Sequence, residues 1–237
     1  MPEKSFGSVW ARPSKRRRDQ PSLSREQIVS AAIELLDADG IEALSMRKLG
    51  VRLGVAAPSM YTHVASKDEL IELVVDEVYG EVAVPRPGPW RAEATRFAHD
   101  LRSVFLRHPW IGSLLGEAGV AYLGPNVLKL SEAALGLFED AGLSLEDADL
   151  AWNTVMAFVV GRATSEAAWL TTLKRSELSE REWKNRLWPA AEQAVRDHPR
   201  LKKLYAAQRN QEPRETNDGD FERGLDCVLD GLATRLT

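Results

Sequence analysis

SMRKLGVRLGVAAPSMYTH, at residues 45–63, contains two short amphipathic segments with a glycine between them. Ser45 is a natural cap for the first helix, and Gly54 stops that helix. Pro58 suits the first turn of the second helix, because its missing N–H would have no partner there. Two short helices joined by a tight turn are typical of the helix-turn-helix, whose geometry fits the DNA major groove. The stretch therefore predicts a DNA-reading unit; a helix pair with no role in DNA binding is the alternative.

Helix signals continue on both sides of this stretch. Ser24 begins a preceding helix and forms a capping box with Gln27, and Gly40 is expected to end it in the left-handed conformation. Ser66 and Glu69 form a second capping box, which starts the helix that follows. The second helix of the helix-turn-helix, which we call the reading helix, thus belongs to a closely spaced group of four helices.

The reading helix is expected to run to about His63 and to have two distinct faces. Its inner contacts with the preceding helices are expected from Leu49, Leu53, Val55, Met60 and Val64. The side chains expected to point outward are Ala57, Pro58, Ser59, Tyr61 and Thr62. An exposed aromatic on so short a helix is costly unless it meets a partner, which favours a binding surface.

The remainder of the chain also has helical periodicity, so the predicted fold class is all-α. Three prolines within residues 85–89 mark a boundary, which divides the chain into a basic arm, a helix-turn-helix domain and a larger helical domain. The expected domains are residues 1–21, 22–84 and 85–237. Helices of the larger domain are expected at 90–107, 111–117, 125–141, 145–173, 180–195 and 220–236. Pro199 is expected to mark a stop, and the polar residues 210–219 are expected to form a mobile loop.

Composition excludes several classes of protein. The 237 residues are 44% hydrophobic and 28% charged, which is ordinary for a globular domain. Cys227 is the single cysteine, which excludes an intramolecular disulfide and argues against a zinc cluster. No membrane span, export signal or catalytic motif stands out, so we expect a cytoplasmic protein that is not an enzyme and holds no cofactor or metal.

Charge is distributed unevenly. The net charge is −4, yet residues 1–23 carry six basic and two acidic side chains, while residues 24–67 carry five of each. The acidic remainder is repelled by DNA, which restricts contact to the basic end. Most of the general attraction to DNA is therefore expected from the arm; a solvated basic tail is the alternative.

Two stretches that overlap this motif, GIEALSMRKLGVRLGV and PSMYTHVASKDEL, resemble the N-terminal domain of the tetracycline-repressor family, and most of all its namesake subfamily. A weaker likeness continues through GLSLEDADLAWNTVMAFVVG and DFERGLDCVLDGL. The resemblance implies a three-helix DNA-binding domain followed by a larger helical domain that binds an effector and dimerises. It also implies a ligand-responsive repressor that binds a palindromic operator as a homodimer. A constitutive DNA binder and an activator are the alternatives.

The same resemblance implies roles for individual positions at the DNA. A base edge, most plausibly guanine, falls to Arg47. Ala57 and Pro58 are expected to contact thymine methyls or sugars, and Ser59 to bond a base or a phosphate. Phosphates are expected to be contacted by Tyr61, His63 and Lys67. Ala57 and Met46 replace polar side chains of the namesake, so the operator should differ from the tetracycline operator. Surface or packing roles are the alternatives for Tyr61 and His63.

The resemblance also implies a cavity in the larger domain. Candidate lining residues are Phe97, Leu101 and Phe105 on one helix face, Trp152, Asn153 and Met156 on the long helix, and Trp110. Ordinary core packing is the alternative for these aromatics. His108 does not align well with a chelating position, which argues against a magnesium–drug complex. An aromatic or hydrophobic effector is expected instead.

The dimer is expected to use the long helix at 145–173 and the last helix at 220–236. The last helix offers an apolar stripe of Leu225, Val228, Leu229 and Leu232, and the long helix offers the small residues Gly161, Ala163 and Ala167. Burial of the same stripe within one subunit is the alternative.

The basic run Lys15-Arg16-Arg17-Arg18 is expected to lie along the DNA backbone or in the minor groove. Deletion of residues 1–21 should therefore weaken DNA binding and flatten its dependence on salt, because fewer counterions are released. Binding titrations at several salt concentrations measure this slope. An unchanged slope would remove the arm from the DNA site.

Overall fold

The structure is a computed structural model that describes residues 23–117, 123–209 and 213–236. Within these ranges the chain is helical and contains no strand, which confirms the all-α prediction. The helices are α1 (Arg25–Asp39), a 3₁₀ turn (Ile41–Ala43), α2 (Met46–Leu53), α3 (Ala57–Met60), α4 (Lys67–Tyr79), α5 (Trp90–Arg107), α6 (Ile111–Glu117), α7 (Pro125–Asp140), α8 (Leu145–Ser176), α9 (Glu180–Ala194), α10 (Pro199–Gln208) and α11 (Pro213–Ala233).

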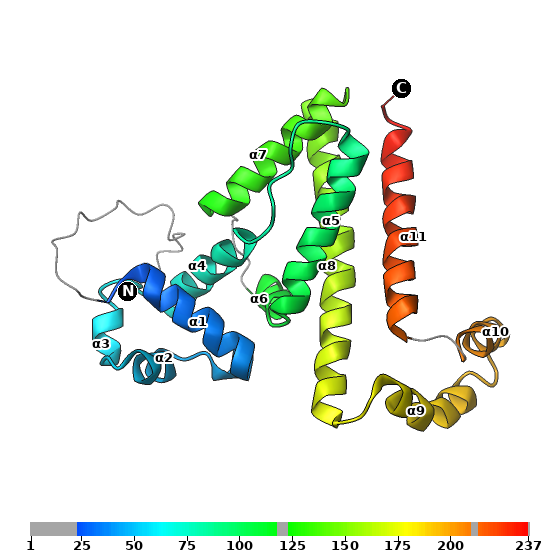
Figure 1. The fold of residues 1–237 in the computed structure, drawn as a ribbon, viewed down its shortest axis with the longest axis horizontal. Coiled ribbons are helices and arrows are strands. Elements are labelled where there is room, and N and C mark those ends of the chain that lie inside the picture. The colour runs from blue at the N-terminus through cyan, green and yellow to red at the C-terminus, as the bar shows by residue number, and fades with distance from the viewer. Residues whose placement is uncertain (1–22, 118–122, 210–212, 237) are drawn as a thin grey trace, which may run out of the picture.

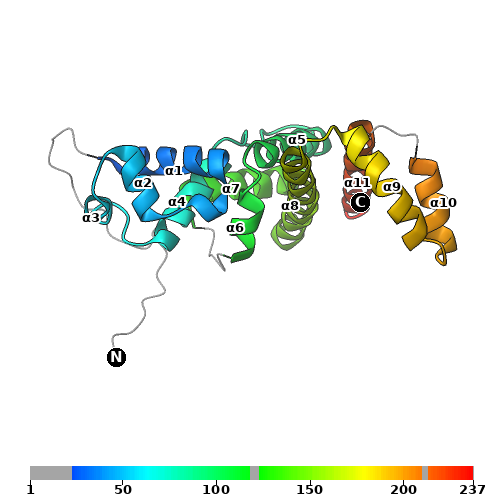
Figure 2. The same cartoon turned by 90° about the horizontal axis from the view of Figure 1, so that it is seen from below.

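The helices form an elongated molecule with three parts in a row (Figures 1 and 2). At one end, α1, α2 and α3 form a small unit that we call the reading head. In the middle, α5, α7 and α11 pack against the long helix α8. At the other end, α9 and α10 project beyond the body. Because α4 packs on α1 and also on α7, it connects the reading head with the body.

Local capping explains where the first helices begin and end. The Ser24 hydroxyl oxygen accepts from the Gln27 backbone N–H, and the Ser24 backbone N–H donates to Gln27 Oε1, as predicted. The Ser45 hydroxyl caps α2, which ends at Gly54 in the left-handed conformation. Gly40 ends α1, as predicted, with a positive φ of 76° that favours glycine, but its ψ of −179° lies outside the left-handed helical region.

Other boundaries differ from the predictions. Helix α3 ends at Met60, and a turn continues to His63. Ser66 caps α4, but the Glu69 carboxylate accepts from the amide of Ala65, so the predicted reciprocal capping box is wrong. The part of the predicted loop that begins at Pro213 is the start of α11.

Proline explains the two largest differences between the predicted and the observed helices. Pro199 begins α10, and Pro213 begins α11, although the sequence had suggested a stop and a loop there. Proline breaks a helix interior, but its fixed φ suits the first turn of a new helix. The same residue type therefore ends one helix or begins the next, depending on its position.

The core of the reading head is built from helix faces that the sequence predicted. Leu49, Met60 and Val64 are fully buried and pack with α1 and α4, while Leu53 and Val55 are partly buried against the same core. This packing holds the two short helices of the reading unit together, since neither is long enough to be stable alone.

The core of the body takes up the apolar stripe of α11. Leu225, Leu229 and Leu232 are buried within the subunit, and Phe221 of the same helix contacts Phe158 of α8 at 5.6 Å between ring centroids. The expectation that this stripe forms the dimer interface is therefore wrong for these leucines. Intramolecular burial, the alternative weighed from the sequence, is what occurs.

A buried carboxylate joins α4 to α7. Asp76 is 4% exposed, and its carboxylate accepts from the amides of Asn126 and Val127 and from the Asn126 side chain, at 3.1 Å each. A Cβ at Gly124 would lie 2.0 Å from Asp76 Oδ1, so only glycine permits this approach. Burial raises the pKa of Asp76, against the opposing effect of the hydrogen bonds from Val127 and Asn126. Asp76 thus satisfies the first amides of α7.

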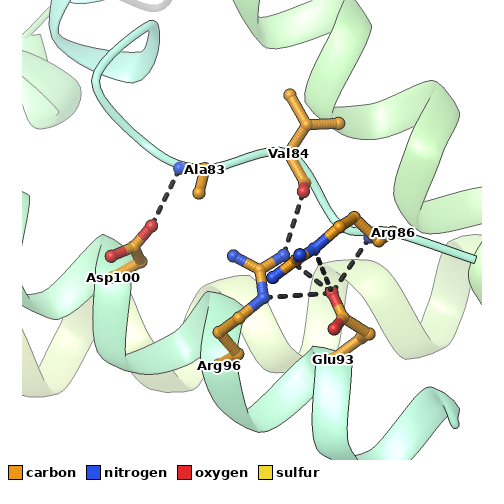
Figure 3. A network of polar contacts seen from close by, with 6 residues as sticks. All are labelled: Ala83, Val84, Arg86, Glu93, Arg96 and Asp100. Atoms are coloured by element: carbon orange, nitrogen blue, oxygen red, sulfur yellow. Dashed lines mark hydrogen bonds and ion pairs between the residues drawn. The ribbon is translucent and has the colours of Figure 1, made fainter. Parts of the chain in front are cut away.

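The segment between α4 and α5 is held against α5 by polar contacts (Figure 3). The Asp100 carboxylate accepts from the Ala83 amide at 2.9 Å, and the Arg96 guanidinium donates to the Val84 carbonyl at 2.9 Å. Glu93 accepts from Arg96 at 2.7 Å and from the Arg86 amide at 3.0 Å. These contacts hold residues 83–86, which follow α4, against the first half of α5.

We predict that Asp76→Asn destabilises the folded chain by about 1–3 kcal/mol at neutral pH, because the buried amides of α7 lose a charged acceptor. The pKa of Asp76 is raised by folding, so the stability of the wild type relative to the variant should be greatest at low pH. It should fall as pH rises through the raised pKa, because ionisation is costlier in the folded state.

Urea unfolding over a series of acidic and neutral pH values measures this difference at fixed protein concentration. Asp140→Asn removes an exposed carboxylate at the end of α7 and is the matched control. Equal effects of the two substitutions would show that Asp76 does not hold α7 in place.

Candidate nucleic-acid interface and effector cavity

The outer surface of the reading head presents the residues predicted to meet DNA. Arg47 on α2, Pro58 and Ser59 on α3, and Lys67 at the first turn of α4 are all exposed. Tyr61, in the turn after α3, is 49% exposed although it is a large aromatic residue. A cation, a hydroxyl and an exposed ring on neighbouring short elements form a surface that can contact both base edges and phosphates.

Hydrogen bonds around α3 fix this surface. The Thr62 hydroxyl donates to the Ser59 carbonyl at 2.7 Å, which closes the turn after α3. Arg25 Nε lies 3.4 Å from the carbonyl of His63, whose side chain is half-buried. Because Arg25 belongs to α1, the turn carrying Tyr61 is held against the first helix.

Other positions named from the resemblance differ in their placement. Met46, which replaces a polar side chain of the namesake subfamily, is only 9% exposed and packs in the core. Arg16, Arg17 and Arg18 and the side chain of Ala57 lie outside the described part of the chain.

A cavity of about 450 Å³ lies in the body beside α4. Its lining residues come from α4, α6, α7 and α8, and they are Tyr79, Leu115, Val127, Leu130, Ser131, Leu135, Asp149, Trp152, Asn153, Met156, Ala157 and Val160. The walls are mostly apolar, and Ser131, Asp149 and Asn153 supply polar groups. This composition is typical of a site for a small organic molecule.

The cavity contains part of the predicted set. Trp152, Asn153 and Met156 line it, as the sequence had suggested. Phe97 lies behind the wall, with its ring centroid 4.8 Å from that of Trp152. Leu101 and Phe105 are also fully buried, so these three side chains of α5 support the wall rather than line it.

Sequence reasoning missed the contributions of α4 and α7. Tyr79 stands at the end of α4, and Val127 and Leu130 stand in the first half of α7. The helical periodicity of residues 125–141 signalled an apolar face, but it did not reveal which helix that face would meet.

Trp110 lies at the contact between the body and the reading head. Its indole N–H donates to Asp37 Oδ1 of α1 at 2.6 Å. His108 Nδ1 lies 2.7 Å from the same oxygen, and His108 Nε2 lies 3.1 Å from Glu81 Oε1. We call Asp37, Glu81, His108 and Trp110 the clasp. His108 and Trp110 are 4% and 5% exposed, whereas Asp37 and Glu81 are exposed, so the clasp joins two buried rings at the turn between α5 and α6 to carboxylates at the surface.

Comparison with known proteins agrees with this geometry. Residues 28–74 match the profile of bacterial regulatory proteins of the tetR family, and residues 84–236 match the tetracyclin repressor-like C-terminal domain. The chain belongs to the tetracycline-repressor family. Members of this family are DNA-binding transcriptional regulators, as the reading head indicates.

Two curated relatives and one solved structure illustrate the likeness. An HTH-type transcriptional regulator of Saccharopolyspora erythraea is 36% identical over 96% of this chain and 92% of its own length. The repressor DrrR1 of Streptomyces coeruleorubidus is 31% identical over 93% and 80%. The structure of Streptomyces coelicolor ActR in complex with actinorhodin has a TM-score of 0.73 and 30% identity, over 90% of this chain and 97% of that one.

Two other kinds of feature are absent from the residues that the structure describes. No helix among them is long and apolar enough to cross a membrane. No group of three or more His, Cys, Asp and Glu side chains in the same part of the chain is arranged to hold a metal ion.

We predict that Arg47→Ala weakens operator binding by about 1–3 kcal/mol and relaxes specificity at one base pair, because a bidentate base contact is lost. Lys67→Gln should weaken binding about equally for all sequences and reduce the salt slope, because a phosphate contact is lost. Operators selected from genomic DNA fragments, followed by titration of point-mutated sites, separate these two effects.

Arg175→Ala, at an exposed position near the end of α8, is the matched control for loss of a cation far from the reading head. If Arg47→Ala and Arg175→Ala bind the operator equally well, Arg47 does not read a base.

Proposed function

We propose that this chain is a homodimeric repressor of a palindromic operator and that a small aromatic or hydrophobic effector in the α4–α8 cavity releases it. The observation that carries the proposal is the position of Tyr79. Its side chain lines the cavity, while the first residue of the same helix, Lys67, lies exposed beside the reading head. One helix therefore contacts both the effector site and the DNA-binding unit.

Two connections transmit a change in the cavity to the reading head. The first is Asp76, which fixes the beginning of α7, a cavity wall, to α4. The second is the clasp, in which Trp110 immediately precedes α6 and donates to Asp37 of α1. An effector that separates α6, α7 and α8 shifts both connections, and so changes the orientation of the reading head.

The direction of the response follows from the geometry of a dimer. Two reading heads enter successive major grooves only when their separation matches the operator. A ligand that binds more tightly to a dimer whose heads have a different separation lowers operator affinity. At saturation the factor is the ratio of the ligand's affinities for the two forms of the dimer. Coupling in such switches is typically about 1–3 kcal/mol, or about 5–150-fold.

Exposed positions on α8 support a dimer face. Leu150 is 47% exposed, and a Cβ at Gly161 would meet nothing within 4 Å, so another helix can approach closely there. Ala163 and Ala167, which the sequence had also suggested, are buried within the subunit. We propose that the exposed side of α8, together with the solvent-facing side of α11 around Cys227, forms the interface.

The nature of the effector follows from the lining of the cavity. Trp152, Tyr79 and the aliphatic residues favour a ring system, and Asn153 supplies a polar contact that fixes orientation. The ActR structure, which contains actinorhodin, supports this class of ligand by analogy. A constitutive DNA binder would have no use for such a cavity, and this disfavours the main alternative.

We predict that Val160→Trp, which places an indole in the cavity, imitates the effector and weakens operator binding by about 5–150-fold. Combining it with Trp110→Phe, which removes the indole N–H bond to Asp37, should recover part of the lost affinity. Fluorescence anisotropy with a selected operator measures all four proteins of this double-mutant cycle.

Leu128→Trp adds the same bulk to an exposed position of α7, outside both the cavity and the proposed interface, and is the matched control. Val160→Trp and Leu128→Trp should each keep the helical circular dichroism of the wild type. Operator affinities that are the same for these two variants would contradict control by the cavity, though not DNA binding.

A further inference from the structure

A second cavity, of about 430 Å³, lies at the opposite end of the molecule from the reading head. It is formed by the second half of α8, by α9 and α10, and by the start of α11 (Figure 1, lower right). Its lining residues are Arg162, Ser165, Glu166, Trp169, Trp183, Lys184, Leu187, Trp188, Ala191, Tyr205, Gln208, Asn217 and Asp220. None of these residues lines the effector cavity, so the two sites are separate.

Aromatic rings form much of the wall of this second cavity. Trp169 of α8 and Trp183 of α9 meet edge to face, with ring centroids 4.3 Å apart. The rings of Trp188 of α9 and Tyr205 of α10 lie 6.1 Å apart with their planes inclined at 43°. The Trp188 N–H donates to Glu192 at 2.8 Å, which holds that ring in place. Rings from three helices around one space favour a flat aromatic ligand.

The helices α9 and α10 have no buried side chain. Their aromatic residues, Trp183, Trp188 and Tyr205, are half-buried and line the second cavity. Large apolar side chains that gather in one place and stay partly open to water mark a binding surface. A ligand in the cavity would cover these rings and would contact α8, α9 and α10 at once.

The lining carries equal numbers of basic and acidic side chains, which are Arg162, Lys184, Glu166 and Asp220. Arg162 lies one helical turn before Glu166, so these opposite charges are neighbours on one face of α8. Lys184 donates, among its contacts, to the Gln208 carbonyl at 2.7 Å. The lining charges therefore balance, and they do not select an ion of either sign.

Both acidic side chains of the lining also have basic partners. Arg102 donates to Glu166 through two hydrogen bonds, at 2.8 and 2.7 Å, and the same guanidinium donates to Asp218 at 2.6 Å. Asp220 is paired with Arg223. A charged ligand would lose its hydration here without gaining an unmatched opposite charge in return. The cavity therefore favours a neutral ligand over an ionic one.

Asn217 supplies a polar contact of the right kind. Its half-buried side chain lines the cavity and forms no hydrogen bond within the part of the chain that the structure describes. A carboxamide has both a donor and an acceptor, so it can pair with a second carboxamide through two reciprocal hydrogen bonds. A carboxylate offers only acceptors and an ammonium only donors, so neither can form this pair.

We propose that this second cavity binds a neutral, planar aromatic amide, with its rings among the tryptophan and tyrosine side chains and its carboxamide on Asn217. A volume of about 430 Å³ lies within the range of small-molecule sites. The site goes beyond the proposed repressor function and does not depend on it, because it shares no residue with the effector cavity or the reading head.

The test is calorimetric titration of the whole 237-residue chain carrying Val160→Trp, which fills the effector cavity. Three ligands share one ring system and differ in charge: neutral 2-naphthamide, anionic 2-naphthoate and cationic 2-naphthylmethylammonium. Naphthamide should bind, and each ion should bind at least about 10-fold more weakly, because its hydration is lost without compensation. Absence of naphthamide binding, or equal or tighter binding of either ion, would overturn the proposal.

Three further substitutions in the same Val160→Trp chain locate the site. Ala191→Trp places an indole in the second cavity and should abolish naphthamide binding. Asn217→Leu should weaken it about 10-fold, because both hydrogen bonds of the carboxamide are lost. Asn185→Leu, at an exposed position of α9 outside the cavity, is the matched control and should leave the affinity unchanged.

Circular dichroism shows whether each of these variants is folded. A folded Ala191→Trp chain that still binds naphthamide would show that the ligand lies elsewhere, and the proposal would be wrong. If Ala191→Trp does not fold, Asn217→Leu decides, because an affinity equal to that of the Asn185→Leu control contradicts the proposed contact.

Sedimentation velocity distinguishes a ligand site from a contact between subunits. If naphthamide does not bind, and Ala191→Trp converts a dimer into folded monomers, the cavity belongs to an interface and the proposal is wrong. If operator binding fails in the earlier experiments while naphthamide binds as described, the second site stands without the repressor function.

Discussion

The rest of the arrangement depends on one buried carboxylate, Asp76. It accepts the free amides at the start of α7 and stands three residues before Tyr79 on α4. A carboxylate in that position resists ionisation, as its raised pKa shows, yet it is the group that holds two helices together. A cavity wall and the helix leading to the reading head are thus joined by the hydrogen bonds of one buried residue.

The clasp provides a second connection with a different character. Asp37 of the reading head forms hydrogen bonds with His108 and Trp110 of the body. The helices within the reading head pack on one another mainly through apolar side chains. Directional hydrogen bonds are lost over small displacements, whereas apolar packing tolerates sliding. The clasp is therefore more sensitive to displacement than the apolar packing within the reading head.

Local signals in the sequence were sufficient for the starts of α1 and α2, but not for the end of α3 or the contact of the Glu69 carboxylate. Caps at Ser24 and Ser45, and the left-handed Gly54, depend on neighbours within a few residues, so the printed order of residues reveals them. The start of α10 at Pro199 was missed because proline both stops and starts helices. Its outcome depends on packing that the sequence does not show.

Sites built from distant parts of the chain could be predicted only in part. Trp152, Asn153 and Met156 share one helix face, so the sequence identified them together. Their partner Tyr79 lies some seventy residues earlier in the chain, and Asp76 meets residues fifty positions away. Leu225 looked like an interface residue because an apolar stripe is the same whether it meets a partner or its own subunit. Only the three-dimensional packing decides such cases.

We propose that the state of the effector cavity controls the separation of the two DNA-binding surfaces of a dimer. The most direct measurement is the distance between spin labels on the two reading heads of a dimer, attached at Lys48→Cys in a Cys227→Ser background. Filling the cavity with Val160→Trp should shift the mean separation of the labels, while Leu128→Trp, at an exposed position of α7 outside the cavity, should not. Identical distance distributions for the filled and unfilled cavity would contradict the proposal.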